Sequence, residues 1–114
     1  PYTPETFHLL SNRRIKLLKK NCIVLNTSRG EIIDENALGE ALLKKKISAV
    51  GLDVFEHEPQ VSPKLLESKN VVLLPHISSS TKESRDAMGI RVLKNILRFS
   101  KGLKPLDIVK NFNL

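Results

Sequence analysis

Three short runs of apolar residues punctuate the chain, and each run leads directly into polar residues. The runs occupy residues 23–25, 49–52 and 71–74. Continuous apolar runs of this length, separated by helical patterns, are typical of strands that are buried on both faces of a parallel sheet. In an open parallel sheet the carboxyl ends of the strands meet at one edge, where ligands bind. We therefore expect the polar segments that follow the three runs to lie close together.

The segments between the runs have the spacing of helices. Apolar residues at 15, 17 and 18 predict a helix over residues 11–20, capped by Ser11 or Asn12. Asp34 is placed to cap a second helix to about residue 45, because apolar residues recur there with the helical period. Ser62-Pro63 predicts a short helix over residues 64–67, since proline is well tolerated at the first helical position.

A long helix is predicted after the third run. Ser80 and Glu83 have the spacing of a capping box, and the helix should continue to about Ser100. Gly102 is expected to end it, and Pro105 prevents its resumption. With strands at about 22–26, 49–54 and 71–74, the predicted fold is α/β. It has three or four parallel strands and a long C-terminal helix.

The composition argues against nucleic-acid and membrane partners. The 114 residues carry a formal net charge of +7, but the basic clusters at 13–20 and 44–46 fall at later turns of predicted helices, where cations are favourable. The chain has four phenylalanines, one tyrosine and no tryptophan, so aromatic residues for stacking on bases are scarce. We expect no nucleic-acid partner and, without a membrane-length apolar run, no membrane partner. A single cysteine, Cys22, suits a reducing, cytoplasmic compartment.

Three motifs follow the apolar runs in order. They are Asn26-Thr27-Ser28-Arg29-Gly30 with Asp34-Glu35-x-Ala37-Leu38 after it, Gly51-Leu52-Asp53-Val54-Phe55-Glu56-His57-Glu58-Pro59, and Asn70-Val71-x-Leu73-x-Pro75-His76-Ile77. Together they resemble the C-terminal part of the D-isomer-specific 2-hydroxyacid dehydrogenases, a family that includes glyoxylate/hydroxypyruvate reductases and D-lactate dehydrogenases. The resemblance runs from Pro1 to about Val109, so it covers nearly the whole chain.

The resemblance implies the second half of a Rossmann-type, doubly wound NAD(P)-binding domain over roughly residues 1–80. Residues 81–114 would form a helix and tail that return to a substrate domain. None of the five glycines forms the Gly-x-Gly-x-x-Gly turn that binds a pyrophosphate. We therefore expect a fragment or a truncated gene product that is inactive by itself, and a homodimer for the full-length protein.

The resemblance also implies an oxidoreductase that transfers a hydride between NAD or NADP and a small 2-keto or 2-hydroxy acid, of the glyoxylate or hydroxypyruvate type. His76 would be the acid/base, because histidine is the side chain best suited to proton transfer near neutral pH. Glu58 would orient the imidazole and favour its charged form. Arg29 would bind the substrate carboxylate through its planar guanidinium, which lysine cannot copy.

Residues beside these three leave alternatives open. Glu56 competes with Glu58, since it lies two positions earlier on the same alternating face. We assign the catalytic role to Glu58, the acid just before proline in the family motif, and expect Glu56 to be a solvated or helix-capping charge. His57 is expected to be exposed. Gly30 indicates either a close backbone approach or a positive φ.

Further expectations concern the cofactor and the second helix. The resemblance implies cofactor contacts from Thr27, Ser28, Arg29, Asp53, His76, Ile77, Ser78 and Ser79. Asp53 would contact the carboxamide or ribose on the nicotinamide side, and no metal ligands are predicted. The family commonly has Gly-Lys-Ile after the second helix, where this chain has Lys45-Lys46-Ile47, so that helix must end without glycine.

The alternative interpretation is a truncated, non-catalytic paralogue that acts as a binding or dimerisation module. The absence of the glycine-rich turn from these residues favours that alternative, whereas the intact set of Arg29, Glu58 and His76 favours the enzyme.

Overall fold

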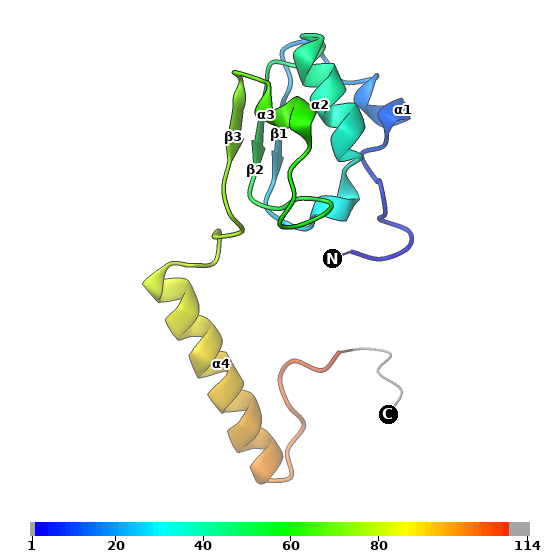
Figure 1. Ribbon diagram of the computed structural model, residues 1–114. Helices are drawn as coiled ribbons and strands as arrows, with labels where there is room; N and C mark the ends of the chain where they lie inside the picture. The colour runs from blue at the N-terminus through cyan, green and yellow to red at the C-terminus, as the bar shows by residue number, and fades with distance from the viewer. Residues whose placement is uncertain (1, 110–114) are drawn as a thin grey trace. The chain divides into compact units, whose positions relative to one another are not determined.

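A parallel sheet lies at the centre of the part of the chain that precedes Ser79. The structure, a computed structural model, describes residues 2–109, and the chain divides into two compact units between Ser78 and Ser79. The strands are β1 (Ile23–Asn26), β2 (Ala49–Leu52) and β3 (Val71–Leu73), in the order β1-β2-β3 and all parallel (Figure 1). The predicted α/β fold and its three strands are confirmed, although each strand is slightly shorter than expected.

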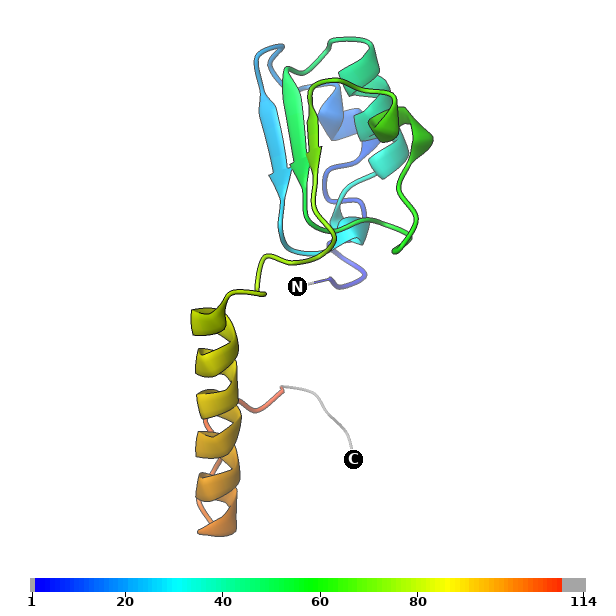
Figure 2. The ribbon, with the colours of Figure 1, turned by 60° about the vertical axis from the view of Figure 1, so that its left-hand side comes forward.

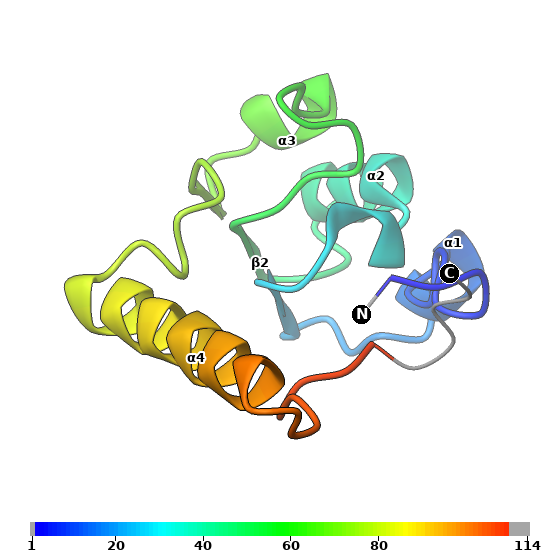
Figure 3. The same cartoon turned by 90° about the horizontal axis from the view of Figure 1, so that it is seen from below.

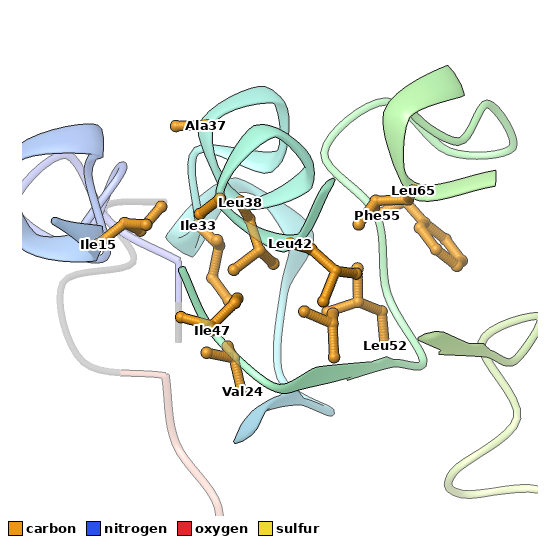
Figure 4. Packing of buried hydrophobic residues seen from close by; sticks show 12 residues of the cluster. Ile15, Val24, Ile33, Ala37, Leu38, Leu42, Ile47, Leu52, Phe55 and Leu65 are labelled. Carbon is orange, nitrogen blue, oxygen red and sulfur yellow. The ribbon is translucent and has the colours of Figure 1, made fainter. Parts of the chain in front are cut away.

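The helices of the first unit cover one face of this sheet. α1 (Asn12–Ile15), α2 (Glu35–Leu43) and α3 (Pro63–Leu66) lie on the same side of the strands in two different views (Figures 2 and 3). Leu38 of α2 and Leu65 of α3 are fully buried against the strands. The core between the two layers also contains Ile15, Val24, Ile33, Ala37, Leu42, Ile47, Leu52 and Phe55 (Figure 4).

The opposite face of the sheet has no cover from the first unit. Ile23 and Leu25 of β1 are 61% and 74% exposed, while Val24 between them is buried. The apolar runs predict strands that are buried on both faces, but within the first unit the strands are covered on one face only. The physical reason is that α1, α2 and α3 all pack on the same side of the sheet (Figures 2 and 3).

The ends of α2 follow from local hydrogen bonds. The Asp34 carboxylate accepts from the N–H of Ala37 at 2.9 Å, which confirms the predicted cap. The helix ends at Leu43, where the N–H of Lys45 donates to Leu42 O and that of Lys46 to Ala41 O. This Schellman pattern needs a left-handed residue, and Lys45 takes that conformation with φ 54°.

The first helix is much shorter than its apolar spacing predicts. α1 stops at Ile15, and the N–H groups of Leu17 and Leu18 donate to carbonyls three residues back, as in a tightening last turn. Leu17, one of the apolar residues behind the prediction, is 79% exposed. Ile15 is buried in the core and Leu18 packs against it only partly buried, so burial does not extend the helix to residue 20. The short helix after Ser62-Pro63 is confirmed as α3.

The second unit is the long helix α4 (Lys82–Ser100) with the segment that follows it. Its cap is Thr81, which accepts from the N–H of Ser84, so the predicted capping box on Ser80 and Glu83 is wrong by one residue. Gly102, with φ 68°, ends the helix as expected. Arg91 donates two hydrogen bonds, of 2.6 and 2.7 Å, to the Asp107 carboxylate and so holds the returning segment.

The helices of residues 2–109 include none that is both long and apolar enough to cross a bilayer. α4 nevertheless exposes a broad apolar side. Its exposed apolar residues are Met88, Ile90, Val92, Leu93, Ile96, Leu97 and Phe99. No residue of α4 is buried within the described part of the chain.

Candidate active site

The candidate site residues meet at the carboxyl edge of the sheet. β1, β2 and β3 end at Asn26, Leu52 and Leu73, and because they are parallel the segments after them share one edge. A hollow of 410 Å³ there is lined by Arg29, Gly30, Glu31, Phe55, Glu56, His57, Glu58 and His76. The structure thus confirms that Arg29, Glu58 and His76 come together, although 47 positions separate the outer two.

Glu58 and His76 form a hydrogen-bonded pair. Nδ1 of His76 lies 2.9 Å from one carboxylate oxygen of Glu58 and 3.1 Å from the other. With the carboxylate as acceptor, Nδ1 carries the proton, and Nε2 is the ring nitrogen that this pair leaves for another contact. The hydrogen bond from His76, a second one from the N–H of Phe55 and the charge of Arg29 hold the pKa of Glu58 below its ordinary value.

The backbone at His76 has an uncommon conformation. Its φ is 54°, in the left-handed region that L-residues other than glycine rarely adopt. Strain of this kind persists only where surrounding contacts fix the residue, and it is concentrated at functional sites. The Asp53 carboxylate provides such contacts, since its oxygens accept from the N–H groups of Ile77 at 2.7 Å and Ser78 at 2.9 Å.

Asp53 therefore holds the loop that carries His76. It is only 2% exposed. Hydrogen bonds from Ser78 and from the N–H of Ile77, together with the charge of His76, lower the pKa of Asp53. The carboxylate stays ionised and keeps the loop in place. Its expected contact with a cofactor stays a prediction.

Arg29 projects from a turn that Asn26 organises. The Asn26 side chain accepts from the N–H and the hydroxyl of Ser28 and donates to Arg29 O at 2.8 Å. Asn26 is buried, whereas Thr27, Ser28 and Arg29 are exposed. The guanidinium donates to Ser28 O at 2.7 Å, which leaves further donors for a ligand. The sequence by itself assigns no role to Asn26; the available signal is a polar residue at the last position of a predicted strand.

Gly30 is required by a close backbone approach. A Cβ at this position would lie 1.9 Å from Phe55 C and 2.0 Å from Phe55 O. Among the described glycines, the positive φ belongs to Gly102 and not to Gly30. Of the two readings left open by the sequence, close approach is therefore right. It brings the Arg29 segment against the segment that leads to Glu58.

Glu56 is neither solvated nor free. Its carboxylate lies 2.7 Å from Nε2 of His8 and accepts from the N–H of Glu35 at the start of α2, at 3.3 Å. Its side chain is 14% exposed. Glu56 is therefore not a solvated charge. It is a helix-capping charge, as the other expectation has it, because its carboxylate accepts from the first N–H of α2. His57 is exposed, as expected.

An apolar hollow of 370 Å³ adjoins the pair and shares Phe55, Glu58 and His76 with the first hollow. Its other lining residues are Pro59, Val61, Leu66, Leu73, Leu74 and Pro75. The acid–histidine pair therefore lies between a polar and an apolar surface. Within residues 2–109, no group of three or more His, Cys, Asp or Glu side chains is placed to hold a metal ion.

Comparison with known proteins identifies the family. Residues 1–78 match the sequence model of the "D-isomer specific 2-hydroxyacid dehydrogenase, NAD binding domain". The chain belongs to the D-isomer specific 2-hydroxyacid dehydrogenase family. The glyoxylate reductase of Thermococcus litoralis is 48% identical over 109 residues, which are 96% of this chain and 33% of the relative. The chain thus spans about a third of the length of the family members that it matches.

Solved structures of the family have the same fold. A glyoxylate reductase from Paecilomyes thermophila aligns with a TM-score of 0.89 at 38% identity, over 98% of this chain and 34% of that one. An NADPH-dependent glyoxylate/hydroxypyruvate reductase from Sinorhizobium meliloti, in complex with NADP and malonate, aligns with a TM-score of 0.88 at 35% identity, over 96% and 34%. The predicted partial Rossmann-type sheet with a C-terminal helix is confirmed.

Proposed function

We propose that this chain supplies the acid/base and the substrate-binding arginine of an NAD(P)-dependent reductase that acts on glyoxylate, hydroxypyruvate or a similar small 2-keto acid. The observation that carries the proposal is the Glu58–His76 pair, 2.9 Å apart, in one hollow with Arg29. The family relationship and the glyoxylate reductases among the relatives support the reaction class and the substrate class.

Each of the three side chains has a defined task. Arg29 binds the substrate carboxylate with two parallel N–H donors and places the keto carbon for attack. His76, protonated, gives the proton on Nε2 to the keto oxygen as that oxygen becomes a hydroxyl. Glu58 accepts from Nδ1, keeps the ring in one orientation and stabilises its positive charge. In the reverse reaction His76 takes the same proton back.

The edge of the sheet fits a nicotinamide cofactor. When bound, NAD(P)H would supply the hydride that goes to the keto carbon. The exposed hydroxyl groups of Thr27, Ser28 and Ser78 suit its carboxamide and ribose. The N–H groups of Ile77 and Ser78 already donate to Asp53, so contacts there use other atoms. Ser79 begins the second unit, and its expected contact stays a prediction.

The wider assignments belong to the same proposal. Residues 1–80 would form the second half of the cofactor domain, and residues 81–114 would return to a substrate domain in the full-length enzyme; Pro1 and residues 110–114 lie outside the described residues. That enzyme is a cytoplasmic homodimer without nucleic-acid or membrane partners. The cofactor is NAD or NADP; a family neighbour in complex with NADP and malonate supports a dinucleotide together with a small carboxylic acid. The exposed apolar side of α4 favours the second candidate, a non-catalytic binding or dimerisation module.

A hybrid enzyme separates the two candidates. In this hybrid reductase, the matched 109-residue segment of the Thermococcus litoralis glyoxylate reductase is replaced by the present sequence. We expect glyoxylate reduction with NADH or NADPH, and a raised KM together with a lower kcat in Arg29→Lys. A hybrid that melts cooperatively and binds cofactor, yet does not reduce glyoxylate or hydroxypyruvate, would favour the non-catalytic module.

A further inference from the structure

The loop that carries Glu58 is held at both ends by one buried carboxylate. Glu35, at the start of α2, is 7% exposed. One of its oxygens accepts from the N–H of Glu56 at 2.9 Å and the other from the N–H of Ser62 at 2.7 Å. These two donors bracket residues 56–62. A single side chain therefore determines where the loop leaves the core and where it returns.

The Glu56 side chain, in the loop, also forms a hydrogen bond with Glu35. One oxygen of its carboxylate accepts from the N–H of Glu35, and the other lies 2.7 Å from Nε2 of His8. The backbone N–H of each glutamate thus donates to the side chain of the other. A donor or a cation beside the Glu56 carboxylate offsets the repulsion from the neighbouring Glu35 carboxylate. His8 provides that donor from a segment 48 positions away.

His8 is itself fixed to the segment that follows Arg29. Its N–H donates to Glu31 O at 2.9 Å, and the N–H of Leu10 donates to Ile32 O at 3.0 Å. Its ring stacks on Phe7 with centroids 4.0 Å apart, and its φ is 46°, in the left-handed region. A residue other than glycine keeps this backbone conformation only where several surrounding contacts fix it. His8 therefore joins the Arg29 segment to the Glu58 loop.

We propose that His8, Glu35 and Glu56 are positioning residues that hold the Glu58 loop against the Arg29 segment and thereby set the distance from Glu58 to Nδ1 of His76. The inference rests on the proposed function, because it gives these residues a purpose within the same site. Glu56 lines the hollow, but its side chain forms hydrogen bonds with His8 and with the N–H of Glu35, so the three residues act through the loop that carries Glu58. A displacement of about 1 Å at a reacting group can cost on the order of 100-fold in rate.

The first test uses His8 variants of the hybrid reductase. His8→Phe keeps a planar ring over Phe7 but removes the donor to Glu56, and we expect kcat to fall about 10- to 100-fold with KM for glyoxylate within about twofold. His8→Gln restores a donor and should recover most of kcat. Glu35→Gln should resemble His8→Phe, whereas Glu67→Gln, an exposed glutamate on the surface, is the matched control for loss of charge. Equal losses in His8→Phe and His8→Gln would overturn the proposal.

The second test uses the 114-residue chain and needs no activity. The carboxyl carbon of Glu58 is followed by NMR as pH falls, in the wild type and in His8→Phe. If His8 positions the pair, the Glu58–His76 hydrogen bond loosens in the variant and the Glu58 titration moves up toward its ordinary range. An unmoved titration would overturn the proposal even if stability falls. An inactive hybrid with a shifted titration would overturn the proposed function alone.

Discussion

Replacement of Gly30 by alanine tests the packing that brings the site together. The added Cβ would lie 1.9 Å from Phe55 C, 2.0 Å from Phe55 O and 2.4 Å from Glu56 N. Non-bonded carbon atoms are comfortable at about 3.5–4.0 Å, so the two segments must separate by roughly 1.5 Å. All three contacts are backbone atoms, and no side-chain rotation can relieve them.

The energetic cost of Gly30→Ala follows from that geometry. Overpacking a core typically costs about 1–3 kcal/mol, occasionally more, and backbone-to-backbone overlap belongs at the upper end. We expect about 3 kcal/mol, which for a unit of this size lowers Tm by more than about 10 °C. The same separation moves Arg29 away from Glu58 and His76, so kcat of the hybrid reductase should fall about 100-fold.

Two other glycines serve as graded controls. A Cβ at Gly39 would approach the side-chain Cβ of Lys64 at 2.8 Å, so Gly39→Ala should cost less than Gly30→Ala. A Cβ at Gly89 would meet nothing within 4 Å, and Gly89→Ala in the middle of α4 should stabilise that helix by about 0.5–1 kcal/mol. Urea unfolding followed by circular dichroism, with hydrogen exchange of β2 amides for Gly30 and Gly39 and of α4 amides for Gly89, measures the three effects. A Gly30→Ala protein within about 0.5 kcal/mol of the wild type would refute the close approach.

Three further predictions follow from local features. Lys45→Gly should stabilise the first unit by about 0.5–1 kcal/mol in urea unfolding, because φ 54° strains lysine and suits glycine. An unchanged or lower midpoint would contradict this. Asp107 has its pKa lowered to about 2 by hydrogen bonds from Arg91 and Asn95. Because the folded pKa is depressed, the stabilisation that this contact gives is complete above the ordinary value of about 3.9 and is lost as pH falls through about 2. Carboxyl NMR should show the Asp107 titration at this low pH and its upward shift in Arg91→Ala. A titration midpoint near 4 in the wild type would show that the Arg91 contact does not lower the pKa of Asp107. Glu58 should likewise titrate below its ordinary value of about 4.3 and shift upward in His76→Ala, so its contribution is also lost toward acid pH. Identical Glu58 titrations in the two proteins would show that the pair does not form in solution.

The sequence predicts the elements whose causes are local. Asp34, Pro63 and Gly102 mark helix ends by chemistry that acts within a few residues, and all three ends are confirmed. The three apolar runs are strands, and because they are parallel, their polar ends meet as expected. Local signals mislead where two neighbouring residues could both cap a helix, as with Ser80 and Thr81. They also mislead where the apolar residues of a predicted helix are not all buried in the core, as in α1.

The contacts that complete the site are not local. Glu56 pairs with His8 and Glu35, which lie 48 and 21 positions away, so its burial could not be read from its own neighbourhood. Gly30 illustrates the same limit. Its sequence context indicates either close approach or positive φ, and only the fold decides between them. The motifs therefore point to the candidate residues Arg29, Glu58 and His76, whereas the contacts that hold their loops become visible only in the fold.

The most direct test of the central claim is the kcat of the hybrid reductase for glyoxylate with His76 intact and with His76→Ala. If His76 is the proton donor and Glu58 its partner, kcat falls by roughly 10²–10⁴, the usual scale for general acid–base catalysis, while cofactor affinity changes little. If His76→Ala retains kcat within about twofold, His76 does not carry the proton and the proposed mechanism is wrong.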